Sequence, residues 1–141
     1  MPTLTSLRLG YFGKKENLDI AEKMKVAFSE CSNLTSVVIP DSVTSIGASA
    51  FQGCSNLTAV VIPDSVTSIE WYAFDSCSSL ATITIKSTSL SVGSNAFSSV
   101  ASTGTIYIPD SKINDDTYKA LFTNKGLPGT WTFAELSKKP E

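Results

Sequence analysis

The stretch FQGCSNLTAVVIPDSVTSIEWYA, residues 51–73, decides the fold, because closely similar stretches precede and follow it without insertion. Each stretch begins with Phe and ends with Ala, so an Ala-Phe pair returns at 27–28, 50–51, 73–74 and 96–97, always at the same 23-residue step. A unit of this length cannot bury its apolar side alone, and its neighbours must stack on it. The sequence therefore predicts a solenoid in which each repeat is one short coil.

Aligned at this step, the apolar residues fall into strict columns. The columns are Cys31, Cys54 and Cys77 with Val100 continuing them; Leu34, Leu57 and Leu80; Val37, Val60, Ile83 and Ile106; Ile39, Ile62, Ile85 and Ile108; and Ile46, Ile69 and Val92. Val37 and Ile39 are next-but-one neighbours, as expected for one face of a strand. Pro40 ends that strand, and residues 43–46 predict a second extended piece. We expect residues 50–54 to form a tight, helical corner.

The pattern Leu-x-x-Val-x-Ile-Pro, Val-x-x-Ile and Ala-Phe-x-x-Cys-x-x-Leu resembles the BspA-type leucine-rich repeat. Residues 28–50, 51–73 and 74–96 match it almost fully, and a fourth unit from Phe97 keeps the strand but has Thr103 in the Leu column. The resemblance implies a leucine-rich-repeat, right-handed β-solenoid with short helical corners. It also implies a bacterial or protist surface protein, used for adhesion or protein binding and located at the cell surface or outside the cell.

We expect one leucine-rich-repeat domain over residues 1–141. Residues 1–26 form a degenerate N-terminal repeat, because residues 4–9 carry the strand signature, but Leu4 precedes Leu34 by more than one repeat step. That spacing predicts an enlarged turn over 10–26, with a helix over 19–25. Residues 27–111 are the repeats, and 112–141 a small α/β C-terminal cap, with a helix around 115–122 and a β-like run near Trp131. The amino edge shows no such cap, so we expect either a missing upstream segment or self-association there.

Charge argues against a nucleic-acid partner. The net charge is −2, and between residues 27 and 111 six acidic residues accompany a single base, Lys86, whereas nucleic-acid binding needs a basic stripe. No apolar run is long enough to span a bilayer, and no signal peptide is visible at the start. Either the protein is intracellular or Met1 begins a fragment, and we favour the fragment because the chain opens inside a repeat.

The residues that could carry chemistry are poorly placed for it. The chain has no His, and its three Cys lack metal-ligand spacing. We favour a buried ladder of thiols over a disulfide, and a disulfide over a metal site. A Ser-His-Asp triad is impossible, and no pocket for paired carboxylates is indicated. We therefore expect neither an enzyme nor a bound cofactor or metal.

Strand positions that point away from the core would form a continuous surface across the coils. The two rows are Ser36, Ala59, Thr82 and Thr105, and Val38, Val61, Thr84 and Tyr107. This face is uncharged and mildly apolar. Two interpretations are almost equally supported: a surface that binds a protein or a glycan, and a plain solvent-exposed sheet. Trp71 and Tyr72 replace small residues of the sibling repeats. They are either an interface anchor or, slightly favoured, Trp71 folds back into a local groove.

The leading hypothesis is therefore a non-catalytic protein-binding or adhesion module, whose partner the sequence does not identify. The alternative is a structural spacer or assembly segment of a longer repeat protein, with no ligand of its own.

Overall fold

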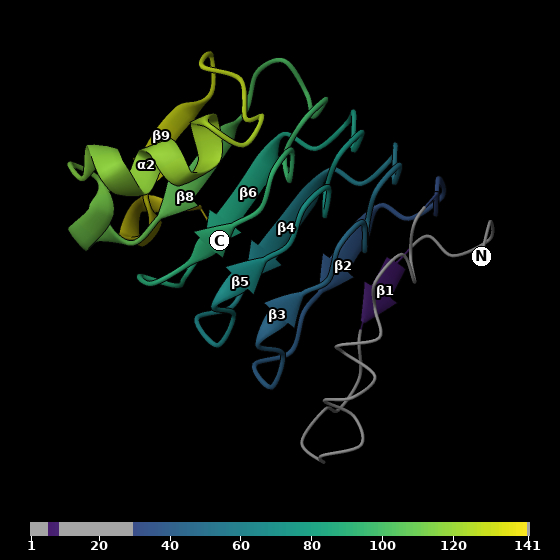
Figure 1. Cartoon of the computed structure of the whole chain (residues 1–141), viewed down its shortest axis with the longest axis horizontal. Coiled ribbons are helices and arrows are strands. Elements are labelled where there is room, and N and C mark those ends of the chain that lie inside the picture. The colour runs from purple at the N-terminus through teal and green to yellow at the C-terminus, as the bar shows by residue number, and fades with distance from the viewer. Residues whose placement is uncertain (1–5, 9–29, 141) are drawn as a thin grey trace.

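The protein is a solenoid of stacked coils, and the computed structural model describes residues 6–8 and 30–140. One strand of each coil enters a six-stranded parallel sheet, which runs through the molecule as a row of arrows in Figure 1. In spatial order its strands are β1 (Ser6–Arg8), β2 (Ser36–Val38), β4 (Ala59–Ile62), β6 (Thr82–Ile85), β8 (Thr105–Ile108) and β9 (Thr132–Glu135). The predicted repeat solenoid is confirmed, and its right-handed sense stays a prediction.

The register follows the repeat step. Val37 pairs with Val60, Val60 with Ile83, and Ile83 with Ile106, so each apolar column becomes a row of side chains on one face of the sheet. Strand β1 pairs in parallel with β2, with Leu7 opposite Val37. The strand expected in the degenerate N-terminal repeat is thus present. The enlarged turn and helix expected within residues 10–26 lie outside the described residues.

A second, smaller parallel sheet lies across each coil from the first. It consists of β3 (Ser45–Ile46), β5 (Ser68–Ile69) and β7 (Ser91–Val92), which are the predicted second extended pieces. Between the two sheets, the chain turns at Pro-Asp-Ser, where Val43 N donates to Pro40 O (3.1 Å) and Val66 N donates to Pro63 O (3.2 Å). Each coil is therefore two short strands joined by two different corners.

The second corner differs from the expected helical turn. Its hydrogen bonds have the short spacing of a 3-10 helix: Ala50 N donates to Gly47 O, and Cys54 N to Phe51 O, both at 3.2 Å. No helix forms there, because two positions in every coil have positive φ and interrupt it. One column is Ser49, Tyr72 and Asn95, and the other is Glu30, Gly53, Ser76 and Ser99.

The core between the sheets is a stack of identical side chains. The rings of Phe51 and Phe74 lie 5.3 Å apart at 7°, and those of Phe74 and Phe97 lie 5.6 Å apart at 5°. All three are fully buried, and the Leu and Ile columns surround them. Repeating coils place the same residue at the same height, so the apolar surface that one coil cannot bury alone is buried against its neighbour.

The C-terminal region ends this stack. Helix α2 (Asp116–Thr123) begins at Asp115, whose side chain accepts from Tyr118 N, and its Phe122 ring lies 5.9 Å from Phe97, continuing the Phe stack. Lys125 O accepts from Phe97 N, which replaces the bond that the next coil would supply. The 3-10 helices η1 (Asp110–Lys112) and η2 (Leu136–Lys138) flank the cap. Strand β9 extends the sheet rather than covering its edge, so the cap closes the Phe core while the sheet ends at β9.

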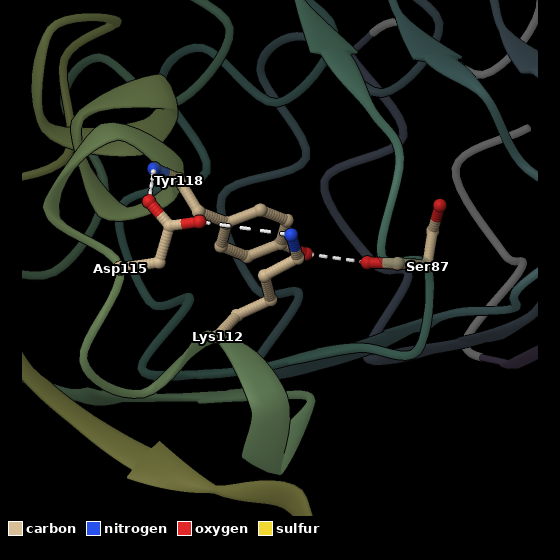
Figure 2. A network of polar contacts seen from close by, with 4 residues as sticks. All are labelled: Ser87, Lys112, Asp115 and Tyr118. Atoms are coloured by element: carbon tan, nitrogen blue, oxygen red, sulfur yellow. Dashed lines mark hydrogen bonds and ion pairs between the residues drawn. The ribbon is translucent and has the colours of Figure 1, made fainter.

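A buried hydrogen bond ties the cap to the third repeat. Figure 2 shows the Tyr118 hydroxyl donating to Ser87 O at 2.5 Å, with Lys112 and Asp115 paired beside it at 3.6 Å. Burial raises the pKa of Tyr118 well above its usual range, so this hydroxyl stays a donor. The third repeat has Lys86-Ser87 where its siblings have Pro-Asp. The cap is therefore anchored to the third repeat at the place where its sequence departs from that of its siblings.

Candidate functional site

From β2 to β8, the side chains on the outer face of the large sheet become less exposed toward the cap. On β2, Ser36 is exposed and Val38 is 46% exposed. On β4, Ala59 is exposed and Val61 is half-buried. Thr82, Thr105 and Tyr107 are also half-buried. The register places these residues in the two predicted rows, neither of which contains a charged side chain.

Thr84 corrects one expectation. It was expected on the solvent-facing row, but it is 1% exposed, and its hydroxyl has no hydrogen-bond partner. The short side chain lies in register between two larger ones, Val61 and Tyr107. The continuous row is therefore interrupted at β6, and Val38 and Val61 form its open part.

The segment after β9 turns back toward the outer face. Ser137 N donates to Asp110 Oδ1 at 3.0 Å, and hydrogen bonding from Ser137, by its side chain first and then its backbone, lowers the pKa of Asp110. Slightly further along the chain, Lys139 Nζ lies 6.0 Å from the centre of the Tyr107 ring, within the range of a cation–π contact. The repeat pattern gives no sign of this contact, because residues 136–140 lie beyond the last repeat. It makes the cap end of the face less accessible than the β2 end.

Trp71 lies in the second corner of its coil, and its position also corrects an expectation. The slightly favoured interpretation placed its ring in a local groove, yet the side chain is 52% exposed. It meets Tyr72 edge to face, with ring centres 5.6 Å apart at 90°. Among the described residues, Trp71 and Val38 are the exposed large hydrophobic side chains.

Tyr72 occupies a backbone position that a bulky residue adopts at a cost. Its φ is +59°, in the column that holds Ser49 and Asn95 in the neighbouring coils. Small polar residues tolerate this left-handed conformation better than a Tyr does. The Tyr72 hydroxyl accepts from Asn95 Nδ2 at 3.2 Å, which fixes the ring against the next coil. This bond was not predicted from the sequence, although the two residues lie one repeat step apart.

The cysteines form the expected ladder of free, buried thiols. Burial raises the pKa of the Cys54 thiol to about 11, and it raises that of Cys77 further. The Cys77 thiol donates to Phe51 O at 3.1 Å. A thiol that stays protonated is a poor nucleophile and a poor metal ligand. These side chains therefore act as small core residues.

Two further observations concern the described part of the chain. Residues 6–8 and 30–140 contain no group of three or more His, Cys, Asp or Glu side chains placed to hold a metal ion. Within the same residues, no helix is long and apolar enough to cross a membrane.

Comparison with known proteins places this architecture in a family. The BspA type Leucine rich repeat region matches residues 22–127, in six copies. The chain belongs to the BspA-type leucine-rich repeat family. The described BspA-type repeats also resemble the crystal structure of a leucine-rich repeat protein from Bacteroides ovatus, with 29% sequence identity and a TM-score of 0.60. That match covers 78% of this chain but 27% of the other, so the chain spans about a quarter of that protein's length. No curated protein matches the sequence.

Proposed function

We propose that this BspA-type repeat domain is a non-catalytic module that binds a protein through the outer face of its large sheet. The observation that carries the proposal is the exposure of Val38, 46%, in two rows whose eight residues, from β2 to β8, include no charged side chain. Regular repeats place equivalent positions of successive strands side by side, which provides an extended surface for a partner. The buried core of a protein interface is apolar and depleted of charged residues, which is the character of these rows.

The core of the domain supports a binding role rather than a catalytic one. Its interior is filled by the Phe stack and the surrounding Leu and Ile columns, and its three thiols are buried, with the pKa of Cys54 and of Cys77 raised by burial. Catalysis would need titratable groups gathered in a concave site. Family membership and the extended face favour recognition, and we extend this to a surface or extracellular location.

The test begins with a protein partner selected against the immobilised domain from a displayed library of protein fragments. The selected fragment is then titrated into ¹⁵N-labelled domain, and the shifted amide signals are mapped. We expect them to cluster on β2 and β4. Val38→Asp should weaken binding by at least tenfold, because the partner would bury an unpaired charge there.

Thr88→Asp is the matched control, because Thr88 is exposed and lies outside both rows. It should leave the affinity within about twofold of the wild-type value. Shifts confined to the small sheet or the cap, with unchanged affinity for Val38→Asp, would contradict the proposed face.

The alternative is a spacer within a longer array. It is supported by the match to a structure of which this chain covers 27%, and by β9 lying at one end of the six-stranded sheet. A spacer that assembles through its ends would self-associate as its concentration rises. Sedimentation velocity from micromolar to millimolar protein tests this, and a monomer throughout would argue against assembly through the sheet edges.

A further inference from the structure

The corner of the second repeat presents an aromatic pair that the fold does not need. The neighbouring coils make the same corner with Ala48-Ser49 and Ser94-Asn95, and they keep the same column of positive φ. Trp71 is 52% exposed, and Tyr72 is a bulky residue at φ +59°. Strained backbone positions cluster at functional sites, and here the strained residue, Tyr72, adjoins the exposed Trp71.

The pair is held in place before any ligand arrives. The Tyr72 hydroxyl accepts from Asn95 Nδ2, and Tyr72 N donates to Ser94 O at 3.0 Å. Trp71 O accepts from Ser49 N at 3.0 Å, so the backbone is bonded to the coils on both sides. Gly93 lets the coils approach closely here, since a Cβ on it would lie 2.4 Å from Trp71 N. A pre-ordered aromatic surface lowers the entropy cost of binding.

The charge around this corner selects the ligand. Glu70 immediately precedes the pair, and Asp75 lies in the same corner, where its backbone N–H donates to Tyr72 O at 3.1 Å. Over residues 30–111 there are six acidic residues and one Lys, and that Lys86 follows β6 at the opposite corner of its coil. Aromatic faces attract cations, and a neighbouring carboxylate strengthens the attraction. A cationic ligand thus meets attractive groups here, while an anionic ligand would be repelled.

We propose that the Trp71–Tyr72 corner binds an arginine side chain of a partner protein, stacked on the exposed indole and paired with the carboxylate of Glu70. A guanidinium is planar and weakly hydrated, so it stacks on an aromatic face and donates to a carboxylate at the same time. A Lys ammonium lacks the planar surface. This inference rests on the proposed function, because it takes the ligand to be a protein. The site itself is separate, because this corner contains no residue of the two outer-face rows.

The test uses a short peptide of alternating Arg and Ser, with a peptide in which neutral citrulline replaces each Arg as the matched probe. Titration is followed by the indole N–H signals of the ¹⁵N-labelled domain. The Trp131 indole is buried and donates to Ala101 O at 2.7 Å, so it serves as an internal reference. We expect the Arg peptide to shift the Trp71 signal and to bind at least threefold more tightly than the citrulline peptide.

Variants locate the binding. Trp71→Ala combined with Tyr72→Ser restores the residues of the first repeat, so it should fold normally by circular dichroism and lose the Arg preference. Glu70→Gln should weaken Arg-peptide binding about three- to tenfold and reduce its dependence on salt. Val38→Asp should leave it unchanged, which separates this site from the outer face.

Three outcomes would overturn the proposal. Equal binding of the citrulline peptide would show that charge is not recognised. Unchanged Arg-peptide affinity in the double variant would place the peptide elsewhere on the acidic body. A shift of the Trp71 signal with a neutral hexasaccharide, without one from the Arg peptide, would assign the corner to a glycan.

Discussion

Replacing Phe74 by Ala should cost far more stability than truncating a half-buried ring at the end of the molecule. Phe74 is fully buried and lies between two parallel rings, Phe51 at 5.3 Å and Phe97 at 5.6 Å. Truncating a fully buried Phe to Ala costs about 3–5 kcal/mol, and we expect the upper half of that range because both ring faces lose a partner. Such a loss is a large part of the ~5–15 kcal/mol that holds a domain folded.

Urea unfolding followed by circular dichroism measures this loss, and thermal unfolding should show a midpoint lower by about 10–20 °C. Phe133→Ala is the matched control. Phe133 is half-buried on the last strand, and its ring lies 6.4 Å from Phe122, so about half the loss is expected. A loss below about 1.5 kcal/mol for Phe74→Ala, or one smaller than for Phe133→Ala, would refute the idea that the Phe stack supports the solenoid.

Three other predictions test separate contacts. Tyr118→Phe removes the hydroxyl that donates to the buried Ser87 carbonyl (Figure 2) and should lower the free energy of unfolding in urea by about 1–2 kcal/mol. Tyr72→Phe loses an exposed bond to Asn95 and should cost about 0.5 kcal/mol or less, so equal losses would contradict the anchoring role. Gly93→Ala places a Cβ 2.4 Å from Trp71 N and should destabilise the domain by about 1–3 kcal/mol. Gly129→Ala, which has nothing within 4 Å of its Cβ, should change stability by less than about 0.5 kcal/mol. Unchanged stability in Gly93→Ala would show that the coils are not in close contact there. Burial raises the pKa of Cys54 from 9.0 to about 11, so this thiol ionises first in the unfolded chain, and stability should fall as pH rises from about 9 to 11. A thermal midpoint that stays constant over this range, or that falls equally in Cys54→Ala, would contradict this prediction.

The scaffold was predictable from the sequence because each structural position recurs, with the same type of residue, in several repeats. The columns through Val37 and Phe51 predicted the register, and even β1 was placed correctly although it precedes β2 by more than one repeat step. The corner was less predictable, since Ser49 and Glu30 do not signal positive φ by residue type. Local propensity therefore suggested a helical turn where left-handed residues prevent one.

The candidate site was harder to predict, because it depends on contacts outside the repeat. Thr84 was expected to be exposed, but the pattern does not show that Val61 and Tyr107 flank it or that Lys139 returns to Tyr107. Trp71 stood out as a departure from its column, yet the sequence did not reveal whether the ring would fold back. Phe122 follows Phe97 by slightly more than one repeat step, so its role in the Phe stack did not follow from the repeat pattern.

The central claim is that each repeat coil is an interchangeable unit held in register with its neighbours. Duplicating residues 51–73 in place tests it most directly, with a duplication of residues 51–72 as the out-of-step control. The in-step chain should remain folded with an equal or higher urea midpoint, because it adds one complete layer to both sheets and to the Phe stack. The control should lose stability, because its added coil is one residue short and lacks the fully buried Ala73, so it cannot stay in register with both neighbouring coils. Equal urea midpoints for the two chains would contradict the claim.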